Sequence, residues 1–123
     1  MAEIRPFAGW RYHQKHTQNI DRLTSPLFDV VSNKQREVLY QTEYNSIHLS
    51  VPQGEHPAEP AKEKLSQWKQ DGVIVQDQLP GIYVYFQHFS LAGRDQTYIR
   101  KGFICNIRIY EWGEKEILRH EST

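Results

Sequence analysis

The sequence is poor in cysteine: Cys105 is the single one among 123 residues. One cysteine cannot form an intramolecular disulfide, so nothing indicates an oxidising compartment. No apolar run approaches the roughly 20 residues that a membrane helix needs. The first residues, MAEIRPF, place a glutamate and a proline where a signal peptide would carry an apolar run. We therefore expect a cytoplasmic protein with no membrane partner.

An excess of charge of either sign is also absent, because fifteen basic and fifteen acidic residues cancel. Long-range attraction to nucleic acid is therefore not expected, although a net charge of zero does not exclude a local basic patch. The glycine patterns of phosphate-binding loops and of dinucleotide-binding folds are missing. Cys105 lies in an apolar segment, where a thiol is inert rather than an activated nucleophile. The length fits one domain over residues 1–123.

The pattern of apolar residues predicts an α+β fold with a mixed, largely antiparallel sheet and two or three helices. Ser32 and Gln35 form a capping-box pattern at the start of one helix, in which Val38 and Leu39 are expected to face the core. A second helix is expected from about Pro60 to Gly72, with Leu65 and Trp68 as its buried stripe. The strands expected around these helices are 2–7, 44–52 and 73–77, and residues 8–26 are expected to form a long ordered loop.

A C-terminal β-hairpin is predicted from residues 81–90 and 96–112, which are joined by a connection containing Gly93. Residues 81–90 are apolar on both faces, which is typical of a central strand. In the second strand Ile99 and Phe103 fall on a face expected to be buried, opposite a polar face with Arg100. After a turn at Gly113, a last short strand is expected.

Several side chains allow a chemical and a structural interpretation. His13 and His16 have a spacing that suits a metal, but the sequence offers no third ligand nearby, so no metal site is expected. His48 and His88 lie in predicted strands, where a hydrogen-bonded, half-buried histidine is the expected role. The basic residues of the hairpin form an anion site or a solvated face; they are Arg94, Arg100, Lys101 and Arg108.

Two further segments carry polar groups that suit phosphate chemistry. Asp29 follows a proline turn and precedes the first helix, where it is a ligand-binding group or a partner of the helix dipole. The last residues, HEST, supply a titrating base, an acid and two hydroxyls. Neighbouring strand residues point to opposite faces, so His120 and Glu121 share a site only if the chain bends there.

Six segments, in order, resemble the N-terminal part of the bacterial domain of unknown function 1015 family. They are IRPFAGWRY, SPLFDVVS, YNSIHLSVP, QWKQDGVIVQD, GIYVYFQHFS with YIRKGFICNIRIYEW, and LRHEST. That family is placed with the ParB and sulfiredoxin-like superfamily, which includes an archaeal free-serine kinase. Family members are longer and continue to an Asp-Gly-His-His-Arg segment that has no counterpart here, so the chain is expected to be an N-terminal piece.

The resemblance implies a phosphotransferase in the full-length protein, with ATP or ADP and magnesium as cofactors. It assigns catalysis to His120 and Glu121, and binding of substrate or phosphate to Asp29, Arg119 and Thr123. Two departures weaken the match: Leu27 and Phe28 replace a proline and a tyrosine of the family pattern, and Arg119 replaces the proline before the histidine. An arginine there adds a phosphate contact.

Three hypotheses follow. In the first, the chain is part of a nucleotide- or phosphate-dependent protein, is inactive alone and binds a nucleotide or small-molecule phosphate. In the second, it is a regulatory module that binds a nucleotide or a partner protein through the aromatic and basic hairpin without chemistry. In the third, it is a structural domain that forms a homodimer through an unpaired sheet edge.

Overall fold

The computed structural model describes residues 1–118 and has the predicted α+β composition, with helices and small antiparallel sheets. The contacts divide the chain into two compact units. Unit 1 comprises Met1–Gly9 and Asp77–Thr123, and unit 2 comprises Trp10–Gln76. The interpretation of 1–123 as one domain stays a prediction.

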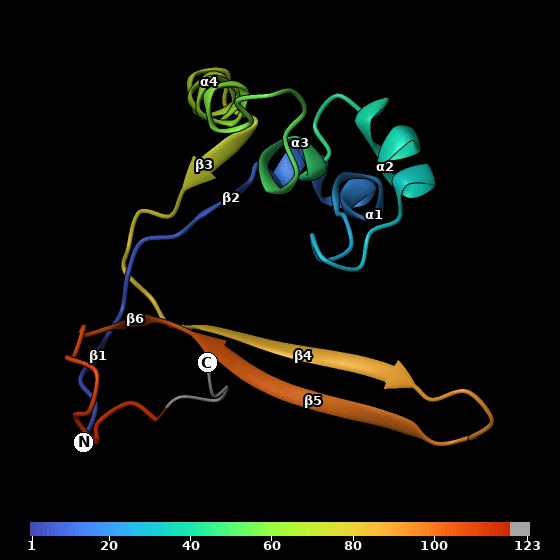
Figure 1. Ribbon diagram of the computed structural model, residues 1–123. Coiled ribbons are helices and arrows are strands. Elements are labelled where there is room, and N and C mark those ends of the chain that lie inside the picture. The colour runs from blue at the N-terminus through green and yellow to red at the C-terminus, as the bar shows by residue number, and fades with distance from the viewer. Residues whose placement is uncertain (119–123) are drawn as a thin grey trace. The chain divides into compact units, whose positions relative to one another are not determined.

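Unit 2 contains all the helices of residues 1–118 and one strand pair (Figure 1). Its strands β2 and β3 are antiparallel, with Trp10 opposite Gln76 and Tyr12 opposite Ile74. The elements in chain order are β2 Trp10–Tyr12, the 3-10 helix η1 Gln14–Asn19, α1 Ile20–Leu23, α2 Asn33–Tyr40, α3 Ile47–Ser50, α4 Ala58–Gln70 and β3 Ile74–Gln76.

The capping box of α2 is confirmed. The backbone N–H of Gln35 donates to the Ser32 hydroxyl at 3.2 Å, and the Gln35 amide oxygen accepts from the Ser32 N–H at 2.9 Å. The expectation that Val38 faces the core is wrong, because its side chain is 61% exposed. Leu39 is half-buried, in line with the expectation. Tyr40 is half-buried too, and its hydroxyl donates to the carbonyl of Val51.

The predicted second helix is confirmed as α4. It ends before Gly72, whose φ of +71° is the left-handed conformation that glycine adopts without strain. Trp68 is 3% exposed and forms the core of the unit with Val73 and Ile74. Leu65 is 38% exposed, so Trp68 alone provides the buried stripe.

The strand expected over residues 44–52 is wrong, because the chain forms α3 there. The cause is Asn45, which is fully buried. Its side-chain oxygen accepts from the N–H of Ile47 at 2.8 Å, and its side-chain nitrogen donates to the carbonyls of Arg22 at 2.9 Å and Thr24 at 3.0 Å. These bonds start α3 and attach it to the end of α1, which an alternating apolar pattern does not reveal.

The long loop expected over residues 8–26 is also wrong. This segment forms β2, η1 and α1, which have three, six and four residues. Elements this short do not establish a sequence period. A local signal does exist at η1, where the ring nitrogen Nδ1 of His13 accepts from the N–H of Lys15 at 3.1 Å.

Unit 1 is built from two antiparallel strand pairs (Figure 1). Strand β1, Ile4–Arg5, pairs with β6, Asn106–Ile107. Strand β4, Tyr83–Ser90, pairs with β5, Thr97–Ile104, and this confirms the predicted hairpin. Gly93 adopts a φ of +79° in the connection between the two long strands.

Opposite residues of an antiparallel pair share a face, so the β4–β5 register defines two surfaces. We call the first the tyrosine face; it consists of Tyr83, Tyr85, Gln87, Phe89, Tyr98, Arg100, Gly102 and Ile104. We call the second the apolar face; it consists of Val84, Phe86, His88, Ser90, Thr97, Ile99, Lys101 and Phe103.

Two expectations about the hairpin are wrong. Strand β4 is an edge strand rather than a central one, because within residues 1–118 it pairs only with β5. Ile99 and Phe103 share a face as predicted, but they are 54% and 61% exposed instead of buried. Among residues 1–9 and 77–118 of unit 1, no third strand or helix covers this face. The apolar pattern therefore does not show that the face is buried. Gly113 does form the expected turn, with a φ of +105°, but no strand follows it up to Leu118.

Candidate functional site

The predicted site residues are only partly placed by the structure. Asp29 is exposed in a turn of unit 2, where the N–H groups of Val30 and Val31 both donate to the carbonyl of Leu27 at 3.1 Å. The other four predicted residues lie outside the described residues; they are Arg119, His120, Glu121 and Thr123.

The helix-dipole interpretation of Asp29 loses support in this arrangement. The carboxylate precedes the N-cap residue Ser32, and the first turn of α2 contains no acidic residue. The favourable interaction of a carboxylate with the dipole falls off within the first helical turn.

Two histidines, His16 and His48, make contacts that indicate structural roles. Nε2 of His48 lies 2.9 Å from the carbonyl of Thr42, as expected for a hydrogen-bonded, half-buried histidine, although His48 is in α3 and not in a strand. The ring of His16 packs against Tyr12 and Tyr44, with centroid distances of 6.3 and 5.7 Å. Within residues 1–118, no group of three His, Cys, Asp or Glu side chains is arranged to hold a metal.

The strongest candidate for ligand binding is a depression on the β1–β6 pair, which we call the β1–β6 recess. Its lining residues are Glu3, Arg5, Asn106, Ile107 and Arg108, and its volume is about 350 Å³. Arg5 lies opposite Asn106 in the strand register, and the N–H of Arg108 donates to the carbonyl of Glu3 at 3.0 Å. Alternation along both strands therefore gathers four polar side chains on one face, and Ile107 also lines the recess.

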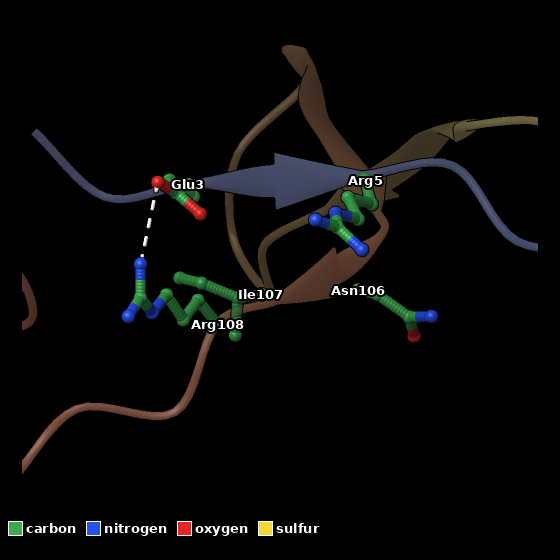
Figure 2. Close-up of a pocket in the computed structure, with 5 residues that line it drawn as sticks. All are labelled: Glu3, Arg5, Asn106, Ile107 and Arg108. Carbon is green, nitrogen blue, oxygen red and sulfur yellow. Dashed lines mark hydrogen bonds and ion pairs between the residues drawn. The ribbon is translucent and has the colours of Figure 1, made fainter.

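Figure 2 shows the Arg108 guanidinium extending toward Glu3, while Arg5 and Asn106 lie further along the strand pair. Arg108 Nη1 is 3.4 Å from Glu3 Oε1, and the two side chains are 63% and 58% exposed. An ion pair this exposed contributes about 0–1 kcal/mol, so a competing anion can replace it at small cost.

Tyr110 supports this end of the recess. Its hydroxyl accepts a hydrogen bond from the N–H of Glu3 at 3.0 Å, and its ring centroid lies 5.8 Å from the Arg108 guanidinium carbon. Two arginines against one glutamate leave a net positive charge in the recess. Guanidinium groups bind carboxylates and phosphates through paired hydrogen bonds, so this donor set suits a small anion.

A family of known proteins matches almost the whole chain. The model of a family described as "Protein of unknown function (DUF1015)" matches residues 4–123. The chain belongs to this family. No curated protein matches, and no solved structure matches. The family match covers three of the four polar side chains of the recess, namely Arg5, Asn106 and Arg108. Within the described part of this DUF1015 protein, no helix has the length and apolar character needed to cross a membrane.

The segment that follows β1 is fixed by a network around Tyr83. The Tyr83 hydroxyl donates to Asp77 Oδ2 at 2.5 Å and accepts from the N–H of Gly9 at 2.8 Å. The N–H of Asp77 in turn donates to the carbonyl of Gly9 at 2.9 Å. The ring of Phe7 packs on Tyr83 at a centroid distance of 5.2 Å. This network holds residues 7–9, and it thereby limits where β1 and Arg5 can lie.

Sequence reasoning on this DUF1015 chain missed most of the recess. It selected Arg108 together with Arg100, but Arg100 belongs to the hairpin, where its guanidinium lies 5.5 Å from the centroid of the Phe89 ring. Glu3 and Arg5 are about as far from Arg108 in sequence as the chain allows, and no local pattern links them. The alternation of Glu3, Ile4 and Arg5 was the available signal, but it does not identify the partner strand.

Proposed function

We propose that this chain is the phosphate-recognising N-terminal part of a nucleotide- or phosphate-dependent protein. The β1–β6 recess carries the proposal, because it presents two guanidinium groups and a side-chain amide on one face. The resemblance of the chain to the ParB and sulfiredoxin-like superfamily, with its free-serine kinase, supports a phosphate-bearing ligand. The same recess is open to a carboxylate, so the experiment below includes both kinds of anion.

Binding would proceed by exchange of partners at Arg108. A phosphate oxygen accepts hydrogen bonds from Arg5 and Asn106, and the Arg108 guanidinium turns from Glu3 toward the ligand. The exchange is favourable because the Glu3–Arg108 pair is exposed and weak. A phosphate accepts stronger, charge-assisted bonds from the same guanidinium.

The chemical step is assigned to the C-terminal residues. Glu121 or His120 moves a proton, the Thr123 hydroxyl and Arg119 hold phosphate oxygens, and Asp29 binds substrate. ATP or ADP with magnesium would supply the transferable phosphate in the full-length protein. The recess fits the phosphate group and not the metal, since Glu3 is the only carboxylate among the described residues that line it. The 123-residue chain alone is expected to be catalytically inactive.

A second candidate is a non-catalytic module that binds a nucleotide or a partner protein through the tyrosine face of the hairpin. Phe89 and Tyr98 are stacked there, with a centroid distance of 5.6 Å and an angle of 24°. Arg94 donates to the Tyr98 hydroxyl at 3.3 Å, and Arg100 lies over Phe89. Stacked rings with adjacent cations bind the flat face of a base and its phosphate.

Calorimetry on the 123-residue chain separates the two candidates. The ligands are inorganic phosphate, ATP, ADP, CTP and, as a carboxylate probe, citrate. Arg5→Ala and Arg108→Ala are expected to weaken phosphate and nucleotide binding at least about tenfold, the loss expected for a charge-assisted bond. Lys115→Ala removes one positive charge from an exposed part of the same unit and should leave binding unchanged.

The pattern of effects decides the outcome. Binding that survives Arg5→Ala and is lost in Arg100→Ala favours the hairpin module. Citrate binding without nucleotide binding contradicts the assignment to phosphate. Nucleotide affinity that is unchanged in both His120→Ala and Glu121→Ala would argue against their assignment to this ligand. Turnover of ATP or ADP with serine by the chain alone at enzyme-like rates would contradict its expected inactivity.

A further inference from the structure

Strand β4 has one edge that lacks a neighbouring strand over residues 84–90. Within residues 1–118 these residues pair only with β5, and no backbone hydrogen bond joins them to a residue outside the hairpin. We propose that this edge is a dimerisation surface, at which the β4 strand of a second copy pairs antiparallel to form a four-stranded sheet with the order β5-β4-β4-β5.

The first argument is that the apolar residues of β4 are arranged as in a central strand, whereas β4 lies at the edge of its sheet. The strand has large apolar or aromatic residues on both faces, among them Val84 and Phe86 on the apolar face and Tyr85 and Phe89 on the tyrosine face. Such a pattern is typical of a strand with neighbours on both sides. A second neighbour would give β4 the central position that its sequence indicates.

The second argument is the distribution of charge between the two edges. Strand β4 contains no Lys, Arg, Asp, Glu or Pro, whereas β5 contains Arg100 and Lys101. Charged residues and proline protect edge strands against pairing with another chain. The β5 edge is therefore protected and the β4 edge is not.

The third argument identifies the occupant as a second copy. Antiparallel strands at an edge are related by a two-fold axis perpendicular to the sheet, so one uncharged strand meets an identical uncharged strand. Arg100 and Lys101 then lie on the outer strands and do not face their copies across the axis. An isolated two-stranded hairpin is marginally stable, and a four-stranded sheet is more stable.

Gln87 offers a test that separates dimerisation from folding. It lies near the middle of β4, directly opposite Arg100 of β5. The variant Gln87→Glu adds a cross-strand pair of opposite charge within one hairpin, which favours the monomeric fold. It also brings two negative charges close together at the two-fold axis. Gln96→Glu makes the same charge change in the connection between the strands and serves as the matched control.

Sedimentation analysis over roughly a hundredfold range of concentration measures the association, which mass action makes concentration-dependent. We expect the wild-type chain and Gln96→Glu to pass from monomer to dimer as the concentration rises. Gln87→Glu should be at least tenfold weaker in dimerisation, with an unfolding midpoint equal to or above that of the wild type. A wild-type chain that is monomeric throughout, or a Gln87→Glu variant that dimerises as well as the wild type, would overturn the proposal.

Discussion

The ring of Tyr85 lies across the strand pair directly over Gly102, its partner in the register. A Cβ atom added to Gly102 would overlap the outer ring atoms of Tyr85. The glycine is thus a place where a ring covers the backbone of the neighbouring strand, rather than a break in β5. A ring in this position compensates for the side chain that glycine lacks in a strand.

Replacement of Gly102 by alanine is therefore expected to destabilise the hairpin by about 1 kcal/mol, because the Tyr85 ring must leave its position. The same substitution in a Tyr85→Ala background should be neutral or stabilising, since alanine fits a strand better than glycine. Urea unfolding of the four proteins gives the coupling energy. Gly81→Ala is the control, because a Cβ there meets nothing within 4 Å. A coupling energy of zero would show that the Tyr85 ring does not depend on Gly102.

Substitution of Asn45 by alanine is expected to destabilise unit 2 by about 3 kcal/mol. The side chain is fully buried and makes three hydrogen bonds, so its loss leaves the carbonyls of Arg22 and Thr24 and the N–H of Ile47 without this partner. Thermal and urea unfolding measure the change. Asn19→Ala is the control, because Asn19 is an N-cap residue whose side chain makes no capping bond. A cost below about 0.5 kcal/mol, the range of surface substitutions, would contradict the role of Asn45.

The extent to which the sequence predicted the fold depended on whether the signal was local. Helix α2 was predictable because the Ser32 and Gln35 capping box lies within four residues, and α4 because Gly72 marks its end. The hairpin was predictable because its strands are long and close in sequence. Helix α3 was not, because Asn45, whose side-chain oxygen accepts from the N–H of Ile47, is held in place by bonds to Arg22 and Thr24, more than twenty residues earlier.

Burial and the candidate site were less predictable for the same reason. The apolar pattern of β4 and β5 indicated a buried sheet, but a pattern shows which residues share a face and not what covers that face. The β1–β6 recess depends on the pairing of Arg5 with Asn106, which are about one hundred residues apart. The residue types of the last segment suggested phosphate chemistry, but only the family resemblance assigned roles to Arg119, His120, Glu121 and Thr123.

The half-buried phenol of Tyr12 should make the stability of unit 2 depend on pH in the alkaline range. Its hydroxyl donates to the carbonyl of Tyr44 at 2.6 Å, and burial raises the pKa of the phenol above its ordinary value of 10.0. A raised pKa in the folded state means that the neutral phenol is favoured there. This stabilisation is complete below pH 10.0 and is lost as the pH rises through the pKa of the folded state.

Unfolding free energies measured from neutral to strongly alkaline pH test this dependence. Tyr12→Phe is expected to be less stable than the wild type at neutral pH by about 1 kcal/mol, the value of one hydrogen bond. The difference should shrink above pH 10.0, where the wild type loses its advantage. Tyr85→Phe, which changes an exposed phenol, is the control. A difference between wild type and Tyr12→Phe that stays constant with pH would exclude Tyr12 as the source.

His16 gives a prediction of the opposite sign, because its replacement should stabilise the fold. The Nε2 atom of His16 is buried and has no hydrogen-bond partner among residues 1–118, while the ring packs against Tyr12 and Tyr44. A buried polar atom without a partner costs about 1–3 kcal/mol. Phenylalanine keeps the ring contacts and removes the polar atom, so His16→Phe should raise the unfolding midpoint.

The exposed His56 provides the matched control, since His56→Phe makes the same chemical change without burial and should leave the midpoint within experimental error. A further variant, His16→Ala, separates the polar atom from the ring. Because alanine removes the ring contacts as well, it should lower the midpoint. If His16→Phe lowered the midpoint as much as His16→Ala, the imidazole nitrogen would have to be stabilising the fold, and the structural reading of His16 as a packing residue would be wrong.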